Sequence, residues 1–341
     1  MKKLFKYYIK KRISILVALF VICLLVFIIG ADPLDRYGKA REELFIRYPI
    51  VLGIITCIIP VIEFSFKMKK TNIDLMYSFP IKRDRLYLTK YLVGLFELLV
   101  PFVLASFVSI IVISTKENAY NLGFVFLYII ALVLVSAFSY TILSFVFIRQ
   151  NTMLDGIILM LLSILALPML VSIVKQFAYM PNFYSMGYEI FAPYSFITSI
   201  FIPLMVKEDY IWSSLMYNEI VGSSLIVMGA IIAFVYTAVT LKNDKSENCM
   251  QLSNAVVGYK ILIPIYSLGA LSTRGSYILS STPFYATIII IITFLAFATW
   301  NRSFKLSKGK WIFFLTISLF DIFMLLANLN DWFCSKIERI C

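Results

Sequence analysis

The sequence predicts an all-α polytopic membrane protein, on the grounds of its composition and the lengths of its apolar stretches. Of the 341 residues, 61% are hydrophobic and only 15% are charged, and the mean hydropathy is +0.90. A soluble globule of that composition has too little charged surface to stay in water. The chain instead holds at least eight apolar stretches of about the length that crosses a bilayer as a helix, roughly 20 residues.

The N-terminal segment predicts a short interfacial helix followed by the first span. Residues 2–12 carry six cations interleaved with aromatic rings, and the apolar run Ile13 to Gly30 follows directly. Because Lys and Arg are enriched on the cytoplasmic side, we expect a multi-pass protein of the cell membrane with a cytoplasmic N-terminus. Asp32-Pro33 stands where a signal peptide would carry a small-residue cleavage motif, which favours a retained span.

Five further spans complete a predicted six-span core over residues 1–241. They are expected at about 49–66, 91–114, 122–148, 156–174 and 221–241. The loop at 67–90 holds seven cations and two acids, so it is predicted to be cytoplasmic. The loop at 31–48 balances four cations with four acids and is predicted to be external. Loop 175–220 contains Pro193 and Pro203 and is expected to form short re-entrant helices in the outer leaflet.

Residues 242–341 are predicted to form a C-terminal transmembrane extension whose number of spans stays open. Two spans are expected at about 283–300 and 311–328, whereas the apolar stretch Ile261 to Leu271 is short for a crossing. The loop at 301–310 has four cations and no acid. This favours nine spans in total, which place the loop in the cytoplasm, over eight spans, which place it outside.

Several functions are excluded by residue types that the chain lacks. Histidine is absent, which removes His-ligated metals and Ser-His or Cys-His hydrolysis. There is no GxxxxGK[ST] phosphate loop. We therefore expect no catalytic residue, metal or cofactor in this chain, and no enzyme activity of its own. The net charge of +12 comes from cations at the ends of apolar stretches, which indicates topology rather than nucleic-acid binding.

One enzymatic motif is present in part. Glu42-Glu43-Leu44-Phe45-Ile46-Arg47 fits the EExxxR pattern of intramembrane proteases of the CAAX type. Those enzymes also need histidines on later helices, so we interpret the hexapeptide as a solvated helical face with Glu43 and Arg47 paired.

Three acids lie within predicted spans. Glu63 and Glu97 are each close to a basic residue at the cytoplasmic interface, Lys67 and Lys90 respectively, and can snorkel or pair with it. Asp321 is deep, eleven residues or about 16 Å from Lys310. A carboxylate at that depth is either a functional group or one partner of a hydrogen bond between helices.

The basic loop between the second and third spans carries the most informative pattern. Thr71 or Asn72 can cap a short helix, Asp74 suits its N-terminal end, and Pro80 should stop it. We expect about two turns that expose apolar side chains for a protein partner, with burial against the membrane surface as the alternative. The residues expected to carry this contact are Asn72, Ile73, Asp74, Leu75, Met76, Tyr77, Phe79, Pro80 and Arg83.

The string Asn72-Ile73-Asp74-Leu75-x-x-Ser78-x-Pro80-Ile81-x-Arg83-x-x-Leu86-Tyr87-x-x-Lys90 resembles the permeases of ABC-2 type transporters. Residues 1–241 are similar to this family, which has the type V exporter fold, and in particular to permeases of low-GC Gram-positive bacteria, including the Ytr-type subunits and exporters of amphipathic peptides. The resemblance implies a coupling helix at 71–80 that docks on an ABC ATPase subunit, which binds ATP and Mg. It also implies a connecting helix at 2–12, external gate helices in 175–220, and a second permease subunit, identical or related.

The sequence thus favours the membrane half of an ATP-driven transporter that exports an amphipathic peptide, an antimicrobial or a lipid-like cargo. Long apolar spans with few polar groups suit a cargo that enters from the bilayer. An ion- or proton-coupled carrier is the first alternative, and only Asp321, Pro101 and Pro168 speak for it. A non-transporting subunit that senses an antibiotic is the second.

Overall fold

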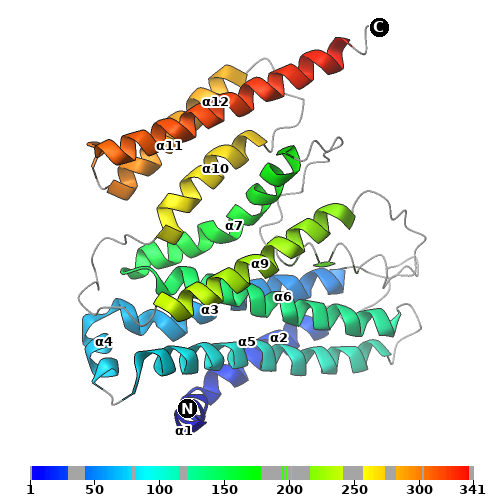
Figure 1. Cartoon of the computed structure of the whole chain (residues 1–341). Helices are drawn as coiled ribbons and strands as arrows, with labels where there is room; N and C mark the ends of the chain where they lie inside the picture. The colour runs from blue at the N-terminus through cyan, green and yellow to red at the C-terminus, as the bar shows by residue number, and fades with distance from the viewer. Residues whose placement is uncertain are drawn as a thin grey trace. The chain divides into compact units, whose positions relative to one another are not determined.

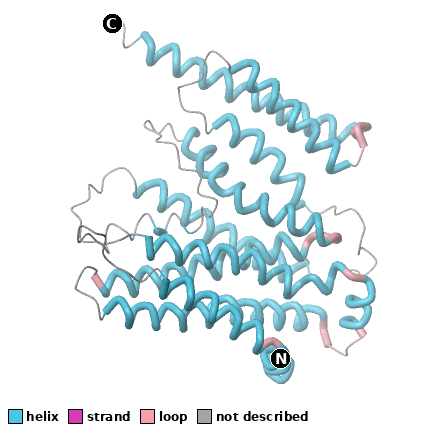
Figure 2. Tube along the Cα trace, turned by 180° about the vertical axis from the view of Figure 1, so that it is seen from behind, coloured by secondary structure: helices cyan, strands magenta, loops and turns pink. Residues whose placement is uncertain are grey.

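The computed structural model describes residues 2–29, 43–78, 81–114, 121–177, 194, 197–198, 201, 216–240, 256–272, 282–301 and 303–337. Within these ranges the chain is helical, with short turns and no strand (Figure 2). The chain divides into two compact units. The first contains Met1–Ile164 and Phe191–Ser253, and the second contains Leu165–Ile190 and Asn254–Cys341. Residues 165–190, which the sequence placed in the core, therefore group with the C-terminal residues.

The first unit is built from long apolar helices that lie side by side (Figure 1). Its elements are α1 (Lys2–Lys11), α2 (Ile13–Ile29), α3 (Glu43–Phe64), the 3₁₀ turn η1 (Ser65–Met68), α4 (Lys70–Tyr77), α5 (Arg83–Ser114), α6 (Leu122–Ile148), the first part of α7 (Met153–Phe177) and α9 (Met216–Thr240). Helix α5 packs against α2, α3 and α6, and α6 packs against α3 and α9. The centre of the unit is thus formed by α3, α5 and α6.

Three described helical stretches are long and apolar enough to cross a membrane: Phe45–Met68, Arg83–Val112 and Leu122–Ile148. A fourth is added if Lys3–Lys11 and Ile13–Ile28, which meet at an angle of 59°, count as one broken span. Shorter apolar helices occur at Met153–Leu167, Gly222–Thr237 and Thr287–Ala298. The chain is therefore a helical membrane protein, and the three stretches overlap the spans predicted at about 49–66, 91–114 and 122–148.

Aromatic side chains from four helices hold the core of the first unit together. Phe27 of α2 contacts Tyr48 of α3, with ring centroids 4.2 Å apart, and Phe102 of α5, with centroids 5.8 Å apart. Tyr128 of α6 lies 5.9 Å from Phe45 of α3 and donates a hydrogen bond of 2.7 Å to the Phe45 carbonyl. These rings are fully buried, and their edge-to-face geometry adds to the energy of burial.

A segment of the long loop 175–220 also enters this core. Its described residues Tyr194, Ile197 and Phe201 belong to or pack on the same apolar cluster. The Tyr194 hydroxyl lies 2.7 Å from Thr56 of α3, and Thr198 lies 3.2 Å from the Tyr128 hydroxyl. Hydroxyl groups thus fix the loop to α3 and α6 through hydrogen bonds, as burial of polar atoms requires. The rest of the predicted re-entrant helices lies outside the described residues.

The second unit contains the later part of α7, the π-helical turn η4 (Val256–Lys260), α10 (Ile261–Ser272), α11 (Thr282–Asn301) and α12 (Lys308–Ile337). Helices α10, α11 and α12 pack against one another. Their apolar cluster centres on Phe297 and Trp300 of α11 and Phe314 of α12. Lys310 lies 4.4 Å from the centre of the Trp300 ring and donates a hydrogen bond of 2.6 Å to Asn301.

Helices α3 and α5 begin earlier than predicted, α5 at Arg83 rather than near residue 91, whereas α10 is as short as its apolar stretch predicts. Helix α3 begins at Glu43 rather than near residue 49, so the described part of the EExxxR hexapeptide is the first turn of a long helix. Hydropathy alone placed the start too late because Arg47 interrupts the apolar run. Helix α10 has 12 residues, about 18 Å at 1.5 Å per residue, which is shorter than the hydrocarbon thickness of about 30 Å.

Among the glycines described in the first unit, Gly94 of α5 leaves the least room for a side chain. It faces residues of α3 and α6. A Cβ atom there would meet the hydroxyl of Tyr140, lie 2.9 Å from the Cζ atom of that ring, and lie 3.1 Å from the Ile59 Cγ2 atom. We predict that Gly94→Ala lowers the free energy of unfolding by about 2 kcal/mol, as other overpacked cores do. Thermal or chemical unfolding of the purified protein measures this.

The control for this substitution is Gly309→Ala, because no atom lies within 4 Å of a Cβ at that helical position. No loss of stability is expected there, since alanine favours the helix. The double variant Gly94→Ala/Tyr140→Phe should recover part of the loss by removing the nearest atom. Equal behaviour of Gly94→Ala and Gly309→Ala would contradict the close approach.

Candidate functional site

Four charged side chains, from the bend between α1 and α2, from α3 and from α5, meet at one end of the first unit. We name them the ionic cluster: Arg12, Glu63, Lys90 and Glu97. Arg12 donates a hydrogen bond from its guanidinium to Glu63 Oε1 and lies 3.6 Å from Glu97 Oε2. Lys90 Nζ lies 3.2 Å from Glu63 Oε2. The two carboxylate side chains have no exposed surface, and those of Lys90 and Arg12 are 4% and 16% exposed.

The composition of the cluster explains how it can be buried. Its two cations balance its two acids, so the group as a whole is neutral when all four are ionised. Burying a charge is costly unless it is paired and hydrogen-bonded, and a guanidinium suits buried pairing because its planar fork presents several donors. Glu63 has both cations as partners, whereas Glu97 faces Arg12 without a hydrogen bond. Glu97 is therefore the less satisfied of the two acids.

Arg12 reaches the cluster because the chain bends at that residue. Helices α1 and α2 meet at 59°, and Arg12 stands between them as a turn residue. Its backbone N–H still donates to Tyr8 and Ile9, and its carbonyl still accepts from Ile15 and Leu16. The bend thus changes the direction of the helix axis while the backbone N–H and carbonyl groups of Arg12 stay hydrogen-bonded. It also restricts the direction in which the guanidinium points.

Tyr8 connects the ionic cluster to the short helix α4. Lys90 Nζ lies 3.9 Å from the centre of the Tyr8 ring, a cation–π distance. The Tyr8 hydroxyl donates to the sulfur of Met76 on α4 at 3.6 Å. Met76 also packs on an apolar cluster that includes Phe66 of η1 and Leu86 of α5. Through these contacts α1, α4 and the first turns of α5 form one continuous structure.

Helix α4 presents a buried side and a polar side. Ile73 is buried at 1% exposure and Met76 is half-buried, while the polar residues Lys70, Thr71, Asn72, Asp74 and Ser78 are exposed. The expectation that Ile73 is exposed for a partner is therefore wrong. Helical spacing explains this, because residues 73 and 76 share the face that packs against the rest of the unit.

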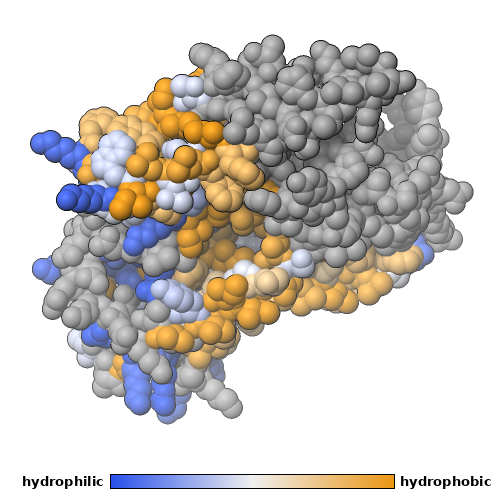
Figure 3. Space-filling model, turned by 45° about the horizontal axis from the view of Figure 1, so that its top comes forward, coloured by the Kyte–Doolittle hydropathy of each residue, from blue (hydrophilic) through white to orange (hydrophobic). Residues whose placement is uncertain are grey.

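The start of α4 also differs from the prediction. The helix begins at Lys70, with Lys69 at the N-cap position and no side-chain capping bond. Thr71 and Asn72 are thus within the first turn and do not cap it. The helix ends at Tyr77, with the Ser78 N–H bonded to the Asp74 carbonyl. In Figure 3, hydrophilic side chains gather at one side of the described surface and apolar ones cover the part beside it.

The other predicted contact residues are described only in part. Leu75 and Tyr77 belong to α4, although their side chains are outside the described part, and Phe79 and Pro80 are outside it altogether. Arg83 is exposed at the first residue of α5. Glu42 also lies outside the described residues.

Lys67 fixes the neighbouring end of α6. Its ammonium donates to the carbonyl of Ile148, the last residue of α6, at 2.6 Å. A cation at this position satisfies a terminal carbonyl and complements the negative end of the helix dipole. Lys67 is buried, so this contact connects η1 rigidly to α6.

Asp321 lies in the second unit. It is 1% exposed, and neither carboxylate oxygen has a hydrogen-bond partner among the described residues. The hydroxyl of Ser318, one helical turn earlier, is likewise buried and unbonded among them. The expected hydrogen bond from Asp321 to another helix is thus not present in the described part of the chain.

The sequence analysis missed Arg12 and Tyr8 as members of the site. A usable signal existed: the acids of the second and third spans both lie near the interface, and Arg12 is the cation closest to the first span. Comparison with known proteins adds no family to this picture, since no family model, curated protein or solved structure matches the chain.

Replacing Arg12 by methionine should destabilise the protein strongly. Arg12→Met leaves Glu97 and one oxygen of Glu63 buried without their cation, and breaking a buried pair on one side costs about 3–5 kcal/mol. The double variant Arg12→Met/Glu63→Met removes one charge of each sign and should lose less than Arg12→Met alone. Equilibrium unfolding of the purified variants measures both values.

Lys10→Met is the matched control, since Lys10 is exposed on α1, two residues before Arg12, and should change stability by less than about 0.5 kcal/mol. A loss from the double variant equal to the sum of the losses from Arg12→Met and Glu63→Met, each measured alone, would contradict an energetically coupled cluster.

Proposed function

We propose that the chain is the permease subunit of an ATP-binding cassette transporter. In this proposal α4 is the coupling helix that docks on a separate ATPase subunit, α1 is the connecting helix, and both lie on the cytoplasmic side. The ATPase subunit binds ATP and Mg and hydrolyses the nucleotide. The chain itself converts the movement of that subunit into opening of a pathway shared with a second permease.

The observation that carries the proposal is the way α4 is attached. Its polar face is exposed and available to a partner, while its inner face is bound through Met76 and Tyr8 to the ionic cluster. The cluster in turn joins the bend at Arg12 to α3 and α5. A push on α4 would therefore reach three long helices through short, specific contacts, which is what transmission of a rigid-body movement requires.

The positions of the few buried charged groups support an amphipathic or lipid-like cargo. The buried charged residues of the described chain are Glu63, Lys67, Lys90, Glu97 and Asp321. All but Asp321 lie at the end of the first unit that carries α1 and α4. Apart from the buried amide of Gln150, the remaining described interior of that unit is apolar, aromatic or hydroxyl-bearing. Such an interior offers little to compensate for the desolvation of a strongly charged solute.

A carrier coupled to ions or protons remains the second candidate, and Asp321 is the observation that favours it. An intramembrane acid without a partner is a functional-site candidate by default. A carrier of that kind also needs irregular backbone at the midplane, and the described part of α12 is a continuous helix. We therefore rank the permease first.

Affinity purification of the tagged chain from its own membranes tests the proposal directly. The expected result is a co-purifying subunit that contains a phosphate loop, together with ATP hydrolysis that the isolated chain lacks. Recovery of the chain without any such subunit, combined with transport in the absence of ATP, would contradict it.

The polar face of α4 gives a sharper test. Asn72→Arg/Asp74→Arg places two bulky cations on exposed positions of α4 and should reduce co-purification of the ATPase about tenfold or more, a loss of at least about 1.4 kcal/mol. Ser114→Arg is the control, since Ser114 is exposed at the far end of α5, about 47 Å from its start at 1.5 Å per residue. Equal retention in both variants would show that α4 does not couple.

Asp321→Asn separates the two candidates. A permease driven by ATP should keep its cargo-stimulated ATP hydrolysis within a few-fold, because the amide occupies the same volume as the carboxyl group. A carrier that couples transport to protonation of this acid should lose transport altogether. The measurement is transport into sealed vesicles, with and without ATP, at equal abundance of the two proteins.

A further inference from the structure

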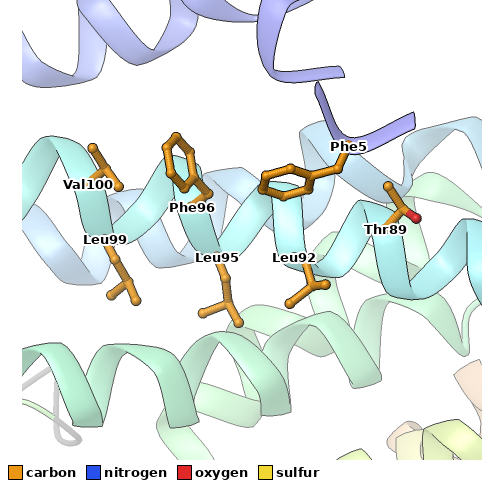
Figure 4. A pocket seen from close by; sticks show the side chains of 7 residues that line it. All are labelled: Phe5, Thr89, Leu92, Leu95, Phe96, Leu99 and Val100. Atoms are coloured by element: carbon orange, nitrogen blue, oxygen red, sulfur yellow. The ribbon is translucent and has the colours of Figure 1, made fainter. Parts of the chain in front are cut away.

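An apolar groove of about 420 Å³ runs between α1 and α5. Phe5 closes it from α1, and Leu92, Leu95, Phe96, Leu99 and Val100 form its wall along α5. The Phe5 and Phe96 rings meet edge to face, with centroids 6.0 Å apart. Figure 4 shows Phe5 reaching from α1 to the level of Leu92 and Thr89. Thr89 is the one polar residue of the lining, and it lies at the end nearest the start of α5.

The length of the groove matches one leaflet of a bilayer. From Thr89 to Val100 the helix rises eleven residues, or about 16 Å. Half of the hydrocarbon thickness is about 15 Å. The groove begins one and a half turns after the exposed Arg83 and ends inside the apolar part of α5, so an extended acyl chain can lie along it.

Basic residues surround the end of the groove at Thr89. Arg85 precedes Thr89 by four residues, so the two share one face of α5. Lys82 comes directly before the first residue of α5. The backbone carbonyl of Lys82 accepts hydrogen bonds from Arg85 and Leu86, which keeps Lys82 in register with α5. Both cations are exposed.

The charges on neighbouring elements do not cancel this positive end. On α1, Lys6 follows the groove residue Phe5 and is exposed. The acid in the first turn of α5, Asp84, is half-buried and lies about 100° around α5 from Arg85. The N-terminal end of α5 itself contributes the positive end of its dipole.

We propose that this groove binds an anionic phospholipid, with one acyl chain between Phe5 and α5 and the headgroup phosphate at Lys82 and Arg85. The apolar lining selects a hydrocarbon chain, and the basic end selects a negative headgroup over a zwitterionic one. The site requires no ATPase partner, so the test of lipid binding is independent of the test of the proposed function.

Native mass spectrometry of the full chain in mild detergent tests this, with phosphatidylglycerol and phosphatidylcholine of identical acyl chains as the probes. Wild-type protein should retain phosphatidylglycerol more tightly. Lys82→Gln/Arg85→Gln should weaken that binding about twenty-fivefold, since each basic residue near an anionic headgroup contributes roughly fivefold, and should leave the binding of phosphatidylcholine unchanged. Lys305→Gln/Lys308→Gln, which removes two exposed cations of the second unit, is the matched control and should bind as wild type.

Leu92→Trp tests the groove itself. The larger side chain should fill the groove and weaken the binding of both lipids, whereas Leu134→Trp on the exposed face of α6 should weaken neither. Equal affinity of the wild type for the two lipids, an equal loss in the two charge variants, or full binding by folded Leu92→Trp would each overturn the proposal. If Leu92→Trp does not fold, the lipid affinity of Lys82→Gln/Arg85→Gln decides the proposal, because both substituted residues are exposed.

Discussion

Four charges buried at one end of a membrane protein can stay there only if they stay together. Arg12 and Lys90 compensate Glu63 and Glu97, and each of these residues comes from an element whose position the others then restrict. Moving α1 away from α3 or α5 would leave a carboxylate buried without its cation, at a cost of several kcal/mol. The bend at Arg12, the end of α3 and the first turns of α5 therefore behave as one block. Because Tyr8 contacts both Lys90 and Met76, α4 belongs to the same block.

Away from the ionic cluster, the helices of the first unit are joined by weaker and more exchangeable bonds. Tyr48 bonds to Ser109, Thr56 to Tyr194, and Tyr128 to the Phe45 carbonyl. These are hydrogen bonds between neutral groups, each of modest net strength, and hydroxyls can change partners by rotating. If the unit opens and closes as a transporter does, the weaker bonds favour movement where hydroxyl groups join the helices. The ion pairs of the ionic cluster favour transmission of that movement without deformation.

Hydropathy and helix period predicted the helices well and the site only in part. Continuous apolar runs such as Leu122–Ile148 leave a helix as the only way to satisfy the backbone in lipid, so the sequence alone predicts them. The buried face of α4 was predicted wrongly at Ile73, because eight residues carry too short a pattern to show which side packs. Arg12 was missed because its partners are 51 and 85 positions away, and only tertiary packing brings them together. Sequence spacing placed Glu63 near Lys67, whereas the structure places Lys67 at the end of α6.

Helix α1 shows how these constraints meet in ten residues. Leu4 and Tyr8 are four residues apart and lie on one face of α1, and Arg12 follows after another four residues. This face packs on the core and the ionic cluster. Phe5 lies next to that face and closes the apolar groove on α5. Lys3, Lys6 and Lys10 occupy the exposed side, where ammonium groups suit an anionic membrane surface. Rotating or lifting α1 would disturb all three environments at once. Any molecule that fills the groove therefore stabilises the position of α1 that also closes the ionic cluster, and through Tyr8 the position of α4.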